Sequence, residues 1–163
     1  MSEQNVAPDF KLVALGVLTT GIGVYFGLVG LEALPPPSQI NGPMWLSLFV
    51  GLIFFAGGVS VIVSGATGAY NRSGELPADA PLWVAMVYWL SGVAMAAGLA
   101  GIGTWVAFGG GTRHFDMAGV IGGPVGEGIG RTIFGIGAIV TWLLVVVMAR
   151  TGAKKIFGRK NGG

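Results

Sequence analysis

Residues 45–69 read WLSLFVGLIFFAGGVSVIVSGATGA, a run of 25 residues without one Asp, Glu, Lys or Arg. An α-helix rises 1.5 Å per residue, so about 20 apolar residues cross the ~30 Å hydrocarbon core of a bilayer. Three further stretches share this uncharged, apolar character, namely residues 12–31, 82–108 and 132–149. The sequence therefore predicts an all-α integral membrane protein, in which four transmembrane helices pack as a bundle in one membrane domain, residues 1–163.

The composition agrees with this fold class and leaves little room for a soluble domain. Of 163 residues, 53% are hydrophobic and 10% are charged, whereas about a quarter of a typical soluble domain is charged. The longest stretch between spans, residues 109–131, is too short to bury a core of its own. We expect it to form an outer loop together with residues 32–44, and we expect residues 150–163 to form a basic tail on the inner side.

Positive charges are distributed unevenly between the two sides of the predicted membrane. The side that carries both termini holds seven Lys or Arg residues, and the other side holds only Arg113 and Arg131. Cytoplasmic segments of membrane proteins carry the excess of Lys and Arg. We therefore expect a multi-pass protein of the bacterial inner membrane with both termini in the cytoplasm.

Five basic residues, with no acidic residue among them, follow the fourth span. Such a juxtamembrane cluster attracts anionic lipid headgroups by about 1 kcal/mol per charge. Nucleic-acid binding is not expected, because the tail has neither a fold nor interleaved aromatic residues. The residues predicted to contact lipid headgroups are Arg150, Lys154, Lys155, Arg159 and Lys160.

Glycine and other small residues recur at helical spacing inside the spans. Lipid is as apolar as leucine, so membrane helices associate where small residues let their backbones approach closely. Two such faces stand out: Gly23 and Gly27 in the first span, and Gly92, Ala96, Ala100 and Thr104 in the third. Two interpretations stay open, namely packing of the four helices against each other and docking onto another membrane protein subunit.

His114 is the only histidine and follows the third span in the sequence GGGTRHFDM. A metal site would use His114 and Asp116, but zinc takes three or four ligands and few others lie nearby. We favour an interfacial polar residue that contacts a partner together with Arg113. No cofactor is predicted, and a bound lipid or pigment stays possible. Trp89 and Trp142 could stack on a pigment or quinone ring, but we expect them to fill space between glycine-rich helices.

Glu127 and Arg131 lie four residues apart before the fourth span. If that turn is helical, the two side chains share one face and form an ion pair. The alternative is an anion clamp formed by Arg113 and Arg131. The surrounding glycine-dense segment lacks the GK[ST] ending of a phosphate-binding loop, so no nucleotide site is expected.

No catalytic motif occurs, and no acidic or basic residue lies inside a span. Proton and ion transport through a bilayer usually relies on such residues. We therefore expect no enzyme but a non-catalytic accessory or assembly subunit of a larger membrane complex. One alternative is a small homo-oligomeric channel or transporter with a pore lined by Ser and Thr; another is a cofactor- or metal-carrying subunit that uses His114.

Overall fold

The computed structural model describes residues 8–36, 43–68, 80–110 and 123–158. These residues form four α-helices and no strand: α1 (Phe10–Gly30), α2 (Leu46–Thr67), α3 (Leu82–Phe108) and α4 (Gly123–Gly158). Each helix is long and apolar enough to cross a membrane. The chain is therefore all-helical in its described part, with four candidate membrane spans, as expected of a multi-pass membrane protein.

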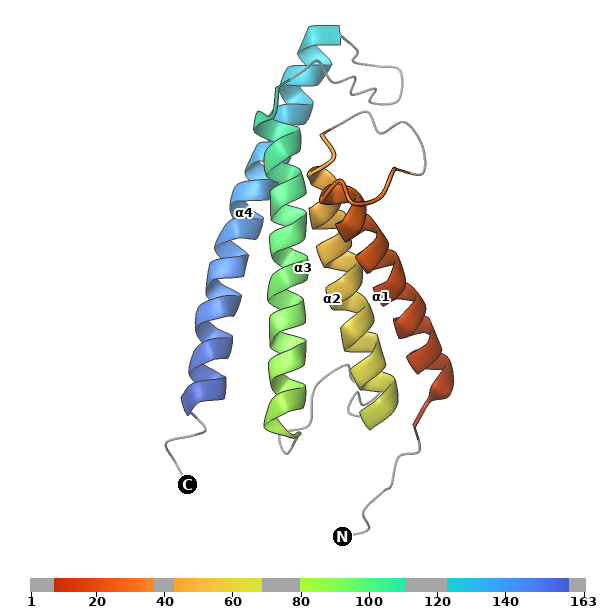
Figure 1. Ribbon diagram of the computed structural model, residues 1–163. Coiled ribbons are helices and arrows are strands. Elements are labelled where there is room, and N and C mark those ends of the chain that lie inside the picture. The colour runs from red at the N-terminus through yellow and green to blue at the C-terminus, as the bar shows by residue number, and fades with distance from the viewer. Residues whose placement is uncertain (1–7, 37–42, 69–79, 111–122, 159–163) are drawn as a thin grey trace.

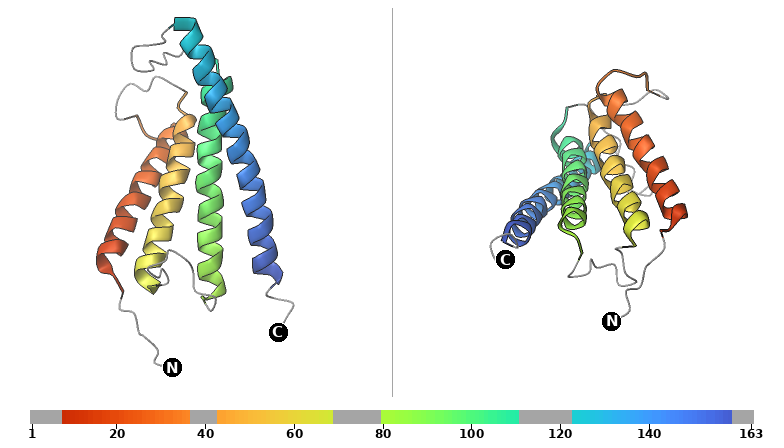
Figure 2. Two further views of the ribbon diagram at one scale, coloured as in Figure 1. Left: turned by 180° about the vertical axis from the view of Figure 1, so that it is seen from behind. Right: turned by 60° about the horizontal axis from the view of Figure 1, so that its bottom comes forward.

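The four helices stand side by side in chain order, as an open row (Figure 1). α1 packs on α2, α2 on α3 and α3 on α4, and within the described residues no other pair of helices has Cα atoms within 8 Å. The view with the lower ends turned forward shows the same order from one edge to the other (Figure 2). The four described helices thus do not close into a bundle, and α2 and α3 each have two broad faces that no other described helix covers.

Small residues fill the contacts between helices, and large apolar side chains face outward. The largest fully buried side chains are only Val29 and Val84. In contrast, Leu18, Leu99 and Leu143 expose 64%, 58% and 62% of their surface. A soluble protein rarely presents so much contiguous apolar surface. Small residues inside and large apolar residues outside are the arrangement expected where lipid, rather than water, surrounds the helices.

The contact between α1 and α2 brings two backbones together. A Cβ atom placed on Gly51 would lie 2.6 Å from the backbone nitrogen of Gly27, and one on Gly16 would lie 2.7 Å from that of Ile62. These positions therefore tolerate no side chain. Six glycines make the contact, each seven residues from the next on its helix: Gly16, Gly23 and Gly30 on α1, and Gly51, Gly58 and Gly65 on α2.

Asp9 fixes the end of this helical pair at which α1 begins. Its carboxylate caps α1 by accepting hydrogen bonds from the backbone N–H groups of Lys11 (3.0 Å) and Leu12 (3.3 Å). Its own N–H donates to the carbonyl of Gly65 at 2.9 Å. One residue thus satisfies free donors at the start of α1 and joins that start to the end of α2.

α4 is the longest helix and differs from the predicted boundaries at both ends. It begins at Gly123, so the expected outer loop 109–131 gives up its last nine residues, and it ends at Gly158, inside the expected basic tail. Proline is tolerated in a first turn, where its missing N–H would have no helical partner, so Pro124 does not prevent this start. The 36 residues measure about 54 Å, more than the ~30 Å hydrocarbon core requires.

Candidate functional site

The predicted docking stripe on α3 lies along α4. A Cβ atom on Gly92 would lie 3.2 Å from Cε of Met148, and Ala100 has no exposed surface. The hydroxyl of Thr104 accepts a hydrogen bond from Nε1 of Trp142 at 3.1 Å and donates to the Ala100 carbonyl at 2.7 Å. The fourth residue of the stripe, Ala96, is half-buried. Docking of a partner at these residues stays a prediction, and the broad faces of the row are the more accessible surfaces.

Gly23 and Gly27 form the second predicted face, and the two glycines differ in their surroundings. Gly23 lies against the backbone of Phe55 in the α1–α2 contact. A Cβ atom on Gly27 would meet no atom within 4 Å, although its backbone touches Gly51. Gly27 therefore combines an internal contact with an open outer side, where it lines a shallow hollow of about 230 Å³.

Trp89 and Trp142 connect α3 to α4 by hydrogen bonds. Nε1 of Trp89 donates to the Met148 carbonyl at 3.0 Å, and the indole occupies the space that the missing side chain of Gly152 leaves. Trp142 donates to Thr104 from the other helix. These rings therefore pack between helices, the simpler of the two roles considered for them. The sequence did not predict this contact, because Gly152, whose missing side chain makes room for the indole, lies beyond the predicted fourth span.

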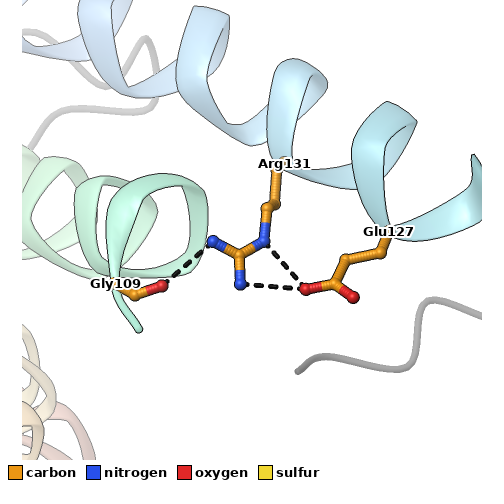
Figure 3. Close-up of polar contacts among 3 residues, drawn as sticks. All are labelled: Gly109, Glu127 and Arg131. Atoms are coloured by element: carbon orange, nitrogen blue, oxygen red, sulfur yellow. Dashed lines mark hydrogen bonds and ion pairs between the residues drawn. The ribbon is translucent and has the colours of Figure 1, made fainter. Parts of the chain in front are cut away.

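Glu127 and Arg131 form the expected ion pair near the start of α4 (Figure 3). Nε and Nη2 of Arg131 lie 3.0 and 2.9 Å from one carboxylate oxygen of Glu127. Nη1 donates to the carbonyl of Gly109, the residue that ends α3, at 3.0 Å. A cation at a helix C-terminus offsets the partial negative charge of its free carbonyls. The guanidinium thus joins α4 to the end of α3.

Several predicted residues lie outside the described part of the chain. They are Arg113, His114, Asp116, Arg159, Lys160 and the side chain of Lys155. Arg150 and Lys154 are described and exposed near the C-terminal end of α4. Arg150 follows Arg131 by 19 residues, about 28 Å along the helix, so the two positions flank one thickness of hydrocarbon. The described residues hold no cluster of three or more His, Asp or Glu that would suit a metal ion.

A groove lies between α2 and α3, and the sequence did not predict it. The two helices are close where Gly98 lies, because a Cβ atom on Gly98 would be 2.6 Å from Cγ1 of Ile53. Nearer the start of α3 they leave a groove of about 250 Å³ that is open along one side. Its lining residues are Leu52, Phe55, Ala56 and Val59 of α2 and Val87, Leu90, Ser91 and Ala94 of α3.

Ser91 is the only polar side chain in this groove, and 6% of its surface is exposed. Each threonine of the four described helices donates to the carbonyl four residues earlier, as Thr20 does to Gly16 at 2.8 Å. Ser91 places one hydroxyl at the wall of an otherwise apolar groove.

Similarity to known proteins assigns no family to this chain. Comparisons with protein-family models, with curated proteins and with solved structures find no match. The functional inference therefore depends on the open row and the charged ends of α4.

Proposed function

We propose that this protein is a non-catalytic accessory or assembly subunit of a larger membrane protein complex. The observation that carries the proposal is the open row, in which the middle helices α2 and α3 have a neighbour on two sides only. A row one helix thick offers a wide face against which the helices of another subunit can pack. In lipid, helices associate through van der Waals packing and interhelical hydrogen bonds.

The polar groups of the helices support a role without transport chemistry. The four uncharged stretches hold no Asp, Glu, Lys, Arg or His, and such residues mark most proton and ion pathways in membranes. The hydroxyls of Thr19 and Thr141 donate to their own helix backbones at 2.8 and 2.7 Å. Groups that are used in this way do not line a polar pathway.

The proposed partners are other membrane protein subunits on one broad face of the row and anionic lipids at the inner ends. α1 begins and α4 ends on the same side of the row (Figure 1). The excess of Lys and Arg on that side supports cytoplasmic termini, and a bacterial inner membrane is the proposed location. Arg150 and Lys154, both exposed, are suited to lipid phosphates there.

Leu90 and Leu99 provide a matched pair of positions for a test. They expose 52% and 58% of their surface, and nine residues of helix, about two and a half turns, place them on opposite faces of α3. The tagged chain and its Leu90→Trp and Leu99→Trp variants are purified from native membranes in mild detergent, and co-purifying proteins are quantified by mass spectrometry.

A stoichiometric complex is expected with the natural chain, and one of the two variants should lose most of it. The other variant serves as the control, because its tryptophan would face lipid. Purification of a single species, alone or as a homo-oligomer, would overturn the subunit proposal. In that case ion or solute flux into liposomes tests the channel or transporter alternative.

A further inference from the structure

The last turns of α4 carry two cations on the side of the helix that faces away from α3. Gly152 lies against the indole of Trp89, so this glycine marks the side of α4 that faces α3. Each residue turns an α-helix by about 100°, which places Arg150 and Lys154 about 160° from Gly152. Both side chains are exposed, and α3 is the one described helix that packs on α4. No described helix therefore covers these two cations.

The same side of α4 is apolar in the turns before the cations. Leu143 and Val147 expose 62% and 58% of their surface. Val147 precedes Arg150 by three residues and follows Leu143 by four, the spacing that places side chains on one helix face. From residue 132 to residue 158 the chain has no Asp or Glu. This face is therefore apolar first and cationic at its end, with no carboxylate of its own helix to neutralise it.

The two cations lie at the level of the lipid phosphates when α4 crosses a membrane. Arg150 follows Arg131 by 19 residues, about 28 Å along the helix, and no charged residue lies between them. The hydrocarbon core is ~30 Å thick, so a span that keeps both guanidinium groups out of it places each of them at a boundary. Lys154 lies about one turn further from the hydrocarbon.

We propose that this face of α4 binds one phospholipid with an anionic headgroup. Its phosphate lies between Arg150 and Lys154, whose Cβ atoms are ~5–6 Å apart at this spacing, and one acyl chain follows the exposed apolar face. An acidic segment of a soluble protein would match the cations but not the apolar face beside them. The inference rests on the anionic-lipid contact of the proposed function, to which it adds a position, a headgroup class and a stoichiometry; it does not depend on the subunit role.

The test titrates the delipidated full-length protein in detergent with phosphatidylglycerol or phosphatidylcholine of the same acyl chains, and native mass spectrometry counts the lipids bound. The natural chain should bind one phosphatidylglycerol roughly thirtyfold more tightly than phosphatidylcholine, about fivefold for each of two cations. Arg150→Gln and Lys154→Gln should each weaken phosphatidylglycerol binding about fivefold and leave phosphatidylcholine binding unchanged. Lys11→Gln removes one exposed cation from α1, at the opposite edge of the row; it is the matched control and should bind as the natural chain does.

Glutamine is a good helix former, so the variants should fold, and circular dichroism and elution volume check this first. Equal affinity of the natural chain for the two lipids would overturn the proposal. An equal loss in a variant with Arg159→Gln and Lys160→Gln would also overturn it, because the attraction would then belong to the whole basic tail.

Inorganic phosphate should not compete with the lipid; if it does, the cations form a general anion site and the proposal is overturned. Variants that keep phosphatidylglycerol binding but release a co-purifying protein from native membranes would assign the cations to a protein contact instead. The subunit role is tested separately by co-purification of the natural chain, so either idea can fail without the other.

Discussion

At the scale of single residues, the glycines of this chain fall into two kinds. At Gly23 the missing side chain makes room for the backbone of a neighbouring helix, whereas at Gly21 and Gly137 a Cβ atom would meet nothing within 4 Å. A glycine of the first kind is therefore expected to matter for the stability of the helix contact, and one of the second kind is not. Substitution by alanine, the smallest change that adds a Cβ atom, separates the two kinds.

Gly23→Ala is expected to lower the free energy of unfolding by about 1–3 kcal/mol, the usual penalty for inserting a methyl group into a close contact. Its Cβ atom would overlap the backbone of Phe55, which a rotamer change cannot relieve. SDS titration in detergent micelles, followed by far-UV circular dichroism, measures the effect. Gly21→Ala is the control and should cause no loss; equal losses in both variants would contradict the assignment.

Glu32 carries the one positive φ angle among the non-glycine residues of the described chain, 59°. It follows α1 at a position where helices usually place glycine, because a side chain is unfavourable in this conformation. Glu32→Gly should therefore raise the free energy of unfolding by about 0.5–1 kcal/mol. Leu31→Gly, where φ is −88°, is the control and should give no gain in the same titration.

At the scale of helices, the three contacts of the row use different packing. α1 and α2 bring backbone against backbone, α2 and α3 place large side chains on glycines, and α3 and α4 combine small residues with two tryptophan hydrogen bonds. The Trp89–Gly152 pair is the most specific of these, because the indole needs both the space and the carbonyl.

Gly152→Ala should destabilise the α3–α4 contact by about 1–3 kcal/mol, since its Cβ atom would overlap the Trp89 ring. Trp89→Ala removes that overlap together with the hydrogen bond to Met148. A double-mutant cycle should therefore show a coupling energy of about 1–2 kcal/mol. Gly137→Ala, on α4 in open space, is the control; additive effects of Trp89 and Gly152 would show that the contact is not specific.

The number and approximate extent of the helices could be predicted from the sequence, because uncharged apolar runs of this length are rare outside membrane spans. Which helix each small-residue face packs against could not be predicted from the sequence, since packing in lipid depends on shape rather than on polarity. The early start of α4 was missed because glycine-rich segments have low helix propensity. That start is stabilised by Arg131, whose bond to Gly109 joins residues 22 apart.

At the scale of the whole molecule, the open row has a consequence for distances between helices. α1 and α4 occupy opposite edges, and no described Cα atoms of the two lie within 8 Å. A closed four-helix bundle would place these helices side by side. Because the chain has no cysteine, introduced cysteine pairs report on this arrangement without background.

The pair Gly103→Cys and Ala138→Cys should form a disulfide on mild oxidation. A Cβ atom on Gly103 would lie 3.4 Å from that of Ala138, near the lower end of the ~3.5–4.5 Å found in disulfides. The control pair, Leu18→Cys and Val140→Cys on α1 and α4, should not form one within a monomer. Thiol alkylation and intact mass of the monomer distinguish the outcomes, and efficient bonding of the control pair would indicate a closed bundle.

The glycine contact between α1 and α2 also bears on how the protein is made. All six of its glycines lie within the first 65 residues, so they are synthesised before the residues of α3. Because chains emerge and fold in N-to-C order, we expect the α1–α2 hairpin to pair before α3 and α4 pack beside it. The order of helices in the row would then follow the order of their synthesis.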